Sequence, residues 1–309
     1  MKSIPAFFFP TTIVCIDDDP LILSAHMRLL ENDFQCKCYD KVNEVKASLE
    51  NYESQLNKID FLKKIDDFEC DNISLHSTIR LDISKIIEIS NNKNRHNEIS
   101  VLLSDFHMPV MNGLELCTLL SGHNFKKMLL TQTDNYKTAK AALNSRTIDY
   151  FANKSDTTEE IREAIKNLVL NYFCDISDSL IKTLAADNIL PMKDPIFVKY
   201  FYDIIEKHLI TEFYLIDANG SYLLIDNKNN KHVLIVHNNN SMDEFISLIK
   251  EYDLNNFDLI EQKQLIPFLG IQKEITDIDV KQINKYLFKS NKLNCKQPYY
   301  VHLIENIEI

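Results

Sequence analysis

The sequence lacks tryptophan altogether and has only 4 glycines among its 309 residues. So little glycine argues against Gly-rich phosphate-binding loops, collagen-like repeats and flexible Gly linkers. Basic residues are also in deficit, because 34 Lys and Arg stand against 45 Asp and Glu, for a formal net charge of -11. This balance argues against a protein that coats nucleic acid through bulk charge.

The 7 cysteines form no Cys-x-x-Cys pair and no Cys/His cluster with zinc spacing. We therefore expect reduced thiols in the cores of a cytoplasmic protein. Cys36 and Cys38 alternate on a predicted strand and would point to one face of a sheet, where buried packing is favoured over metal binding. No run of about 18 apolar residues predicts a membrane helix, and Phe7–Phe9 is too short for a signal peptide.

Hydrophobic residues make up 45% of the chain, enough for a core in each of the two domains that its length predicts. Strands and helices alternate about five times in residues 1–174, which predicts a doubly wound (βα)5 parallel sheet covered on both faces. Residues 51–97 carry helical apolar spacing and are interpreted as a helical insertion beside the third strand. The predicted strands are Thr12–Ile16, Phe34–Tyr39, Ile99–Ser104, Met128–Thr131 and Ile148–Ala152.

Residues 175–309 follow a different pattern, in which strands are grouped and helices come afterwards. This order predicts a smaller α+β domain with an antiparallel sheet, and Asn219-Gly220 is a hairpin signal. No helix pair with a basic, Gly-containing turn occurs here, so we do not expect direct binding of DNA. The predicted strands are Glu212–Asp217, Tyr222–Asp226, Val233–His237 and Tyr299–Ile304, and the predicted helices are Phe197–Leu209, Met242–Glu251 and Gln282–Phe288.

Chemically active side chains follow the predicted strands of the first domain. Asp17 and Asp18 end the first strand, Asp105 the third and Thr131 the fourth, while Lys154 follows the fifth. The carboxyl ends of parallel strands share one edge, so these residues should meet. Carboxylates held together need a cation, and hard oxygen ligands suit Mg²⁺. With a lysine charge and a threonine hydroxyl, such a pocket can stabilise a phosphoryl group moving onto a carboxylate.

Four motifs occur in a fixed order along this domain: Asp17-Asp18, the stretch Leu102–Gly113 (LLSDFHMPVMNG), Leu129-Leu130-Thr131, and Asp149–Lys154 (DYFANK). Together they resemble the receiver domain of two-component response regulators, from about residue 11 to residue 173. The protein is thus expected to be a phosphoprotein of a two-component phosphorelay. Its second half resembles small sensor domains of the PAS kind in shape only, and would be a non-DNA-binding output domain.

The resemblance implies a role for each matching residue. Asp105 would accept a phosphoryl group from a phosphohistidine on a histidine kinase or phosphotransfer protein. Asp18 and Asp105 would bind Mg²⁺ directly, His107 would bind it through its backbone carbonyl, and Asp17 would support the metal or bind it through water. Lys154 would form an ion pair with Asp105 or the phosphoryl group. The protein would not be a turnover enzyme, and at most would dephosphorylate itself.

The resemblance also implies a conformational switch. Thr131 would hydrogen-bond the phosphoryl oxygen, and Phe151 would turn inward when Thr131 moves toward the phosphate. Phosphorylation would then control the output domain, or favour a homodimer formed through the surfaces around Lys137–Leu143 and Ile161–Tyr172.

Alternatives exist at four positions. Asp19 is interpreted as a helix cap before Pro20 rather than as a metal ligand. Thr133 could supply the switch hydroxyl, Tyr150 could replace the neighbouring phenylalanine as the switch residue, and the ring of His107 could bind the metal.

Three features depart from the family pattern. Ser155 stands where the family usually has proline, and Gln132 stands where it prefers a small residue. Asp18 and Asp105 are 87 positions apart, about twice the ordinary spacing, which marks the insertion. Two other hypotheses are a pseudo-receiver that acts as a scaffold without phosphorylation, and an enzyme of the haloacid-dehalogenase kind. The latter would need a second aspartate two residues after the nucleophile, where this chain has His107.

Overall fold

The computed structural model of the chain describes residues 3–65, 78–132, 135–184, 190–250, 252, 254, 256–271 and 280–307. It divides into two compact units. The parallel-sheet unit comprises Phe9–Ile59 and Asn92–Ile176, and the antiparallel-sheet unit comprises Met1–Phe8, Asp60–Asn91 and Ser177–Ile309. Among the helices described, none is both long enough and apolar enough to cross a membrane.

The parallel-sheet unit contains the predicted five-stranded sheet, with all neighbours parallel and the order β3-β2-β6-β7-β8. Every residue of the two central strands β2 and β6 is buried, as expected for β-branched and leucine-rich runs covered on both faces. The strands are β2 (Thr12–Ile16), β3 (Gln35–Tyr39), β6 (Ile99–Asp105), β7 (Lys126–Thr131) and β8 (Tyr150–Asn153).

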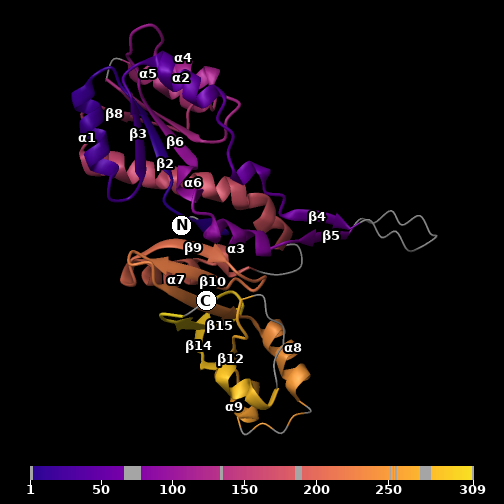
Figure 1. Ribbon diagram of the computed structural model, residues 1–309. Helices are drawn as coiled ribbons and strands as arrows, with labels where there is room; N and C mark the ends of the chain where they lie inside the picture. Colours follow the sequence, from indigo (N-terminus) through magenta and orange to yellow (C-terminus); the bar gives the residue numbers. More distant parts are fainter. Residues whose placement is uncertain are drawn as a thin grey trace, which may run out of the picture. The chain divides into compact units, whose positions relative to one another are not determined.

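Helices cover both faces of this sheet (Figure 1). Val14, Leu102 and Leu129 point from three strands into one core, which residues of α2, α4 and α5 complete. Alternate strand positions face α1 and α6 on the other side, where Arg162 of α6 pairs with Asp33 after α1 at 2.7 Å. The helices are α1 (Pro20–Leu30), α2 (Val42–Glu50), α4 (Gly113–Leu119), α5 (Tyr136–Asn144) and α6 (Thr158–Leu184), of which α6 continues beyond this unit.

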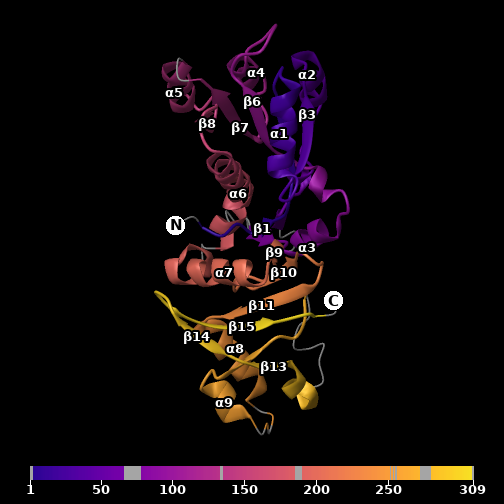
Figure 2. The ribbon, with the colours of Figure 1, turned by 90° about the vertical axis from the view of Figure 1, so that its left-hand side faces the viewer.

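The antiparallel-sheet unit confirms the predicted α+β class. Its six strands follow the order β1-β9-β10-β11-β15-β14, and each pairs antiparallel with its neighbours (Figure 2). Between β9 and β10, Asp217 accepts hydrogen bonds from three successive backbone N–H groups, and Gly220 has φ +101°. The strands are β1 (Phe7–Phe8), β9 (Ile210–Leu215), β10 (Tyr222–Asp226), β11 (Lys231–His237), β14 (Asn291–Asn294) and β15 (Pro298–Ile304).

Helices and a small second sheet complete this unit. The helix predicted at Gln282–Phe288 is wrong, because the chain forms a 3-10 helix and then strand β13, which pairs with β12. The apolar spacing of this short segment fits both structures, and pairing with β12 decides between them. The elements are α7 (Pro195–Lys207), α8 (Asn239–Ile249), α9 (Phe257–Glu261), β12 (Leu265–Pro267), β13 (Leu287–Lys289), and the 3-10 helices η4 (Pro191–Lys193) and η6 (Val280–Tyr286).

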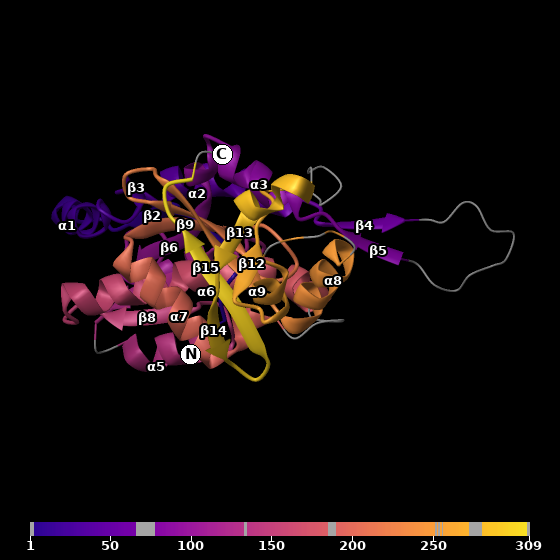
Figure 3. The ribbon, with the colours of Figure 1, turned by 90° about the horizontal axis from the view of Figure 1, so that it is seen from below.

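The predicted helical insertion at 51–97 is largely wrong. Strands β4 and β5 lie side by side as an antiparallel pair (Figure 3), and α3 is the one α-helix among the residues of this segment that the structure describes. Short apolar runs do not distinguish a strand from a helix by spacing alone, which explains the error. Phe68, part of the helical pattern, lies outside the described residues. The elements are β4 (Leu62–Ile65), β5 (Thr78–Leu81), α3 (Ser84–Asn91), and the 3-10 helices η1 (Leu56–Lys58) and η2 (Arg95–Asn97).

The compact units also differ from the predicted boundary after residue 174. Residues 1–8 and 60–91 belong to the antiparallel-sheet unit, although we predicted them in the first domain. The cause is a long-range pairing: β1 adds to the edge of β9, and the ring of Phe8 stacks on Phe213 at 5.4 Å. Helix α3 packs against the same strand β9.

Candidate functional site

Three aspartates meet at the carboxyl edge of the parallel sheet, as the sequence predicts. Strand β6 ends in Asp105, and Asp17 and Asp18 directly follow β2, its neighbour in the sheet. Oxygens of the three carboxylates lie within 4.8 Å of one another. Asp17 and Asp105 are almost fully buried, at 1% and 4% exposure, whereas Asp18 is exposed. Such a cluster concentrates negative charge where little water is available to screen it.

Lys154 partly compensates this charge. It follows β8, and its Nζ lies 2.9 Å from Oδ1 of Asp105 and 3.2 Å from Oδ2 of Asp17. Burial opposes the lysine charge, but the two carboxylates outweigh burial and raise the pKa of Lys154. Burial also raises the pKa of Asp105, although Lys154 acts against this shift. Among the described residues, Lys154 pairs with two of the three clustered carboxylates, so the cluster still favours binding of a further cation.

The donor set suits a hard divalent ion such as Mg²⁺. Carboxylate oxygens from three residues are its preferred ligands, and Asp18 is open to the solvent waters that Mg²⁺ usually retains. The ring of His107 is not part of the acidic group, because its Nε2 hydrogen-bonds the side-chain nitrogen of Asn135. The backbone N–H of His107 instead donates to Asp105. His107 is thus held at the site through its main chain.

Asp19, the third aspartate of the acidic run, has the structural role predicted for it. Its carboxylate accepts a hydrogen bond of 2.8 Å from the backbone N–H of Leu21, and Pro20 opens helix α1. The N–H of Asp19 in turn donates to Oδ1 of Asp17 at 2.9 Å. The helix cap therefore helps to hold Asp17 toward the acidic cluster.

The loop after β6 is fixed by close packing against α4. Backbone hydrogen bonds join Phe106 N–H to the carbonyl of Leu130 and Gly113 N–H to the carbonyl of Phe106. A Cβ at Gly113 would lie only 2.1 Å from the carbonyl oxygen of Asp105. Only glycine therefore allows α4 to begin so close to Asp105.

Thr131 and Phe151, the two residues of the predicted switch, lie on neighbouring strands. Thr131 ends β7, is 2% exposed, and donates from Oγ1 to the carbonyl of Gln132 at 3.1 Å. Phe151 packs partly buried against the core of α2, α4 and α5, edge-to-face with Tyr136 at 5.3 Å. Tyr150, the alternative switch residue, is 43% exposed. Thr133, the alternative hydroxyl, lies outside the described residues.

Ser155, which stands where the family usually has proline, is held in its turn by local hydrogen bonds. Its backbone N–H and its Oγ both donate to Oδ1 of Asn153 at 2.9 Å. A proline could not make the first of these bonds. The turn after β8 is therefore held by side-chain hydrogen bonds, and Lys154 still reaches both buried carboxylates.

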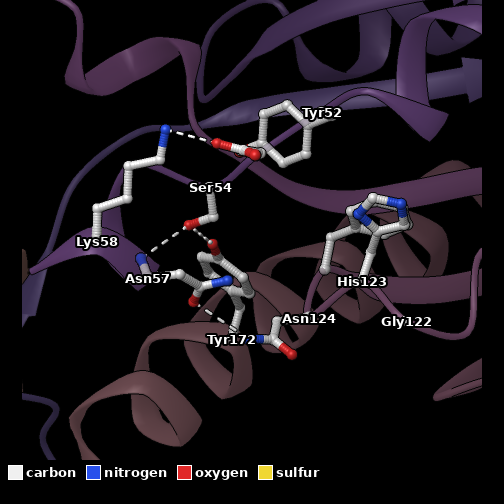
Figure 4. A pocket seen from close by; sticks show the side chains of 10 residues that line it. Tyr52, Ser54, Asn57, Lys58, Gly122, His123, Asn124 and Tyr172 are labelled. Atoms are coloured by element: carbon white, nitrogen blue, oxygen red, sulfur yellow. Dashed lines mark hydrogen bonds and ion pairs between the residues drawn. The ribbon is translucent and has the colours of Figure 1, made fainter.

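A pocket of about 370 Å³ lies elsewhere in the same unit (Figure 4). This pocket could not be predicted from the sequence, because its residues come from distant segments and carry no motif. Ser54 and Tyr172 belong to its buried part and lie beside Glu98, whose carboxylate accepts hydrogen bonds from Tyr172 Oη and Gln55 N–H. The pocket is lined by Tyr52, Glu53, Ser54, Asn57, Lys58, Gly122, His123, Asn124, Phe125 and Tyr172, and includes no residue of the acidic site.

The sheet order and the residues at its carboxyl edge give the parallel-sheet unit the fold of a response-regulator receiver domain. No protein-family model matches the sequence, and no curated protein matches it either. Similarity to solved structures is found instead, and in one case it covers the whole chain.

One solved structure resembles the chain over its full length. The response regulator LqsR from Legionella pneumophila matches with a TM-score of 0.78 and 25% identity, covering 100% of this chain and 92% of that one. Shorter matches include a receiver domain protein from Clostridium thermocellum, with a TM-score of 0.33, 17% identity, and coverage of 52% of this chain and 94% of that one. A CheY-like receiver domain protein from Methanospirillum hungatei JF-1 gives a TM-score of 0.36 at 17% identity, covering 53% and 96%. Of these three structures, LqsR alone has a TM-score above 0.5, and its similarity covers both units.

Proposed function

We propose that the protein accepts a phosphoryl group on Asp105 from a phosphohistidine of a histidine kinase or phosphotransfer protein. The observation that carries this proposal is the position of Asp105, a buried carboxylate with Lys154 at 2.9 Å and two further aspartates beside it. A carboxylate oxygen attacks phosphorus, the P–N bond breaks, and an acyl phosphate forms. The electron pair of that bond stays on the imidazole nitrogen, which binds a proton.

Each residue at the site has a distinct proposed role in this transfer. Asp18 and Asp105, with the carbonyl of His107 and support from Asp17, would hold Mg²⁺, which supplies positive charge for the phosphoryl oxygens. Lys154 already contacts Asp105 and provides a fixed charge that needs no rearrangement. The acyl phosphate is a product of the transfer and not of a catalytic cycle. The protein is thus proposed to be a phosphoacceptor, with at most hydrolysis of its own phosphoryl group.

Thr131 and Phe151 are proposed to convert phosphorylation into a change of shape. The hydroxyl of Thr131 donates to the carbonyl of Gln132, and it can exchange that acceptor for a phosphoryl oxygen. Movement of Thr131 would open space for the ring of Phe151, which packs one strand away. The antiparallel-sheet unit, as the proposed output domain, would respond to the resulting change at the surface of α5.

Phosphorylation at Asp105 can be measured directly. The protein is incubated with Mg²⁺ and a small phosphodonor such as acetyl phosphate, and its intact mass is recorded. We expect an adduct of about 80 Da, roughly one phosphoryl group. Asp105→Asn should abolish it, because an amide cannot form the acyl phosphate. No adduct in the wild type, or the same adduct in the variant, would contradict the proposal.

Phosphorylation is also proposed to favour a homodimer. Most apolar residues of the predicted surface Ile161–Tyr172 on α6 are buried, whereas Lys137 and Lys140 of α5, together with Tyr150, are exposed. We expect light scattering to show a doubled mass after phosphorylation. Lys140→Glu should weaken this dimer, and Lys182→Glu on α6 serves as the control. Equal masses with and without phosphodonor would refute this part of the proposal.

The alternative function, a scaffold that acts without phosphorylation, has no observation in its favour. A scaffold needs neither buried acidic ligands nor a lysine directed at them, and this chain has both.

A further inference from the structure

Three thiols lie in a row on one face of the parallel sheet. Cys15 on β2 is fully buried and lies directly opposite Cys38 on the edge strand β3, while Cys36 lies opposite Ile13. Side chains alternate along a strand, so the three cysteines share the face opposite that of Val14. Cys36 and Cys38 are partly exposed. One buried thiol is therefore flanked by two that solvent can reach.

Hydrogen bonds connect the three thiols. The bond from Cys15 lowers the pKa of Cys36 and likewise that of Cys38, more than burial raises them. The thiolate, the reactive form, is therefore favoured at the two outer cysteines.

We propose that Cys15 and Cys38 form a reversible disulfide, so that this unit carries an oxidation site distinct from its phosphorylation site. With hydrogen peroxide as the oxidant, the thiolate of Cys38 attacks one oxygen and the O–O bond breaks. A sulfenic acid and a hydroxide ion form, and the hydroxide takes a proton from solvent to become water. The sulfur of Cys15 then attacks the sulfenic sulfur. The S–O bond breaks, the S–S bond forms, and a second water leaves with the thiol proton.

Geometry selects Cys38 over Cys36 as the partner of Cys15. Neighbouring strands are about 4.8 Å apart, so residues directly opposite each other fall inside the Cα separation of about 4.4–6.8 Å that disulfides need. The diagonal from Cys15 to Cys36 is about 8 Å by the same strand dimensions, which is too long without backbone movement. The disulfide would join β2 to β3 two residues before Asp17.

Peptide mapping can identify the linkage, because trypsin separates all three cysteines. Cleavage after Arg28, Lys37 and Lys41 places them on peptides 3–28, 29–37 and 38–41. The full chain is treated with hydrogen peroxide, its free thiols are alkylated, and it is digested without reductant. We expect peptide 3–28 joined to peptide 38–41, at the sum of their masses less two hydrogens, and lost on reduction.

Matched variants separate the partners. Cys38→Ser should abolish the linked species, because it removes the thiol opposite Cys15, and Cys36→Ser should retain it. The two variants are matched, because each replaces a partly exposed thiol on the same edge strand. Protein oxidised in urea should lose the preference for this pair, because the fold no longer brings the strands together. A link between 3–28 and 29–37, or oxidation without any link to 38–41, would overturn the proposal.

Discussion

Replacing Lys154 with alanine is expected to slow formation of the phosphoryl adduct on Asp105 by about 100-fold or more, the usual effect of removing one charge-stabilising donor. Lys154 contacts both buried carboxylates, at 2.9 Å to Asp105 and 3.2 Å to Asp17. It is therefore the side-chain cation placed to compensate charge that develops as phosphorus approaches. The rate is measured by intact mass at fixed concentrations of Mg²⁺ and phosphodonor.

Lys126 provides a matched control for this variant. It is also a partly buried lysine with two carboxylate partners, Asp149 at 3.3 Å and Asp175 at 2.5 Å, but it begins β7 at the other end of the sheet. Lys126→Ala should leave the phosphorylation rate within a few-fold of wild type. Equal slowing by both variants would mean that general destabilisation, and not the charge at the site, causes the effect.

Gly113→Ala is expected to destabilise the protein by about 3 kcal/mol, the upper end of the usual cost of overpacking. The added methyl would lie 2.1 Å from the carbonyl oxygen of Asp105, 2.7 Å from Oγ of Ser104 and 2.9 Å from a methyl of Leu129. The closest atom belongs to the backbone and cannot rotate away. Either α4 or the end of β6 must move, so phosphorylation of Asp105 should slow as well.

Gly122→Ala is the control, because a Cβ at Gly122 would have no other atom within 4 Å. Urea unfolding should give nearly the wild-type midpoint for this variant and a clearly lower one for Gly113→Ala. If the two variants are equally stable, the tight approach of α4 to Asp105 is not real.

The position of the site could be predicted from the sequence because it follows from the topology of a parallel sheet. Strand ends that are far apart along the chain share an edge of a parallel sheet, so Asp17, Asp105 and Lys154 are brought together once the strands are recognised. The strands themselves are buried apolar runs, which are among the clearest local signals. The role of Asp19 followed from local chemistry as well, since an aspartate before proline caps a helix.

The features that could not be predicted depend on distant partners. Phe7 and Phe8 form a strand only because β9 offers an edge about 200 residues later, and two residues carry no periodic signal of their own. The same limit applies to β4 and β13, short segments whose apolar spacing also fits a helix and whose pairing partner decides the outcome. The compact units differ from the predicted domain boundary for the same reason.

The most direct test of the account is a crystal structure of the protein with Mg²⁺ and beryllofluoride, which mimics a phosphoryl group. We expect beryllofluoride on a carboxylate oxygen of Asp105, Mg²⁺ held by Asp18 and Asp105, and Lys154 turned toward the fluorines. A structure in which this edge of the sheet stays empty under saturating conditions, with Asp105 and Lys154 pointing apart, would contradict it.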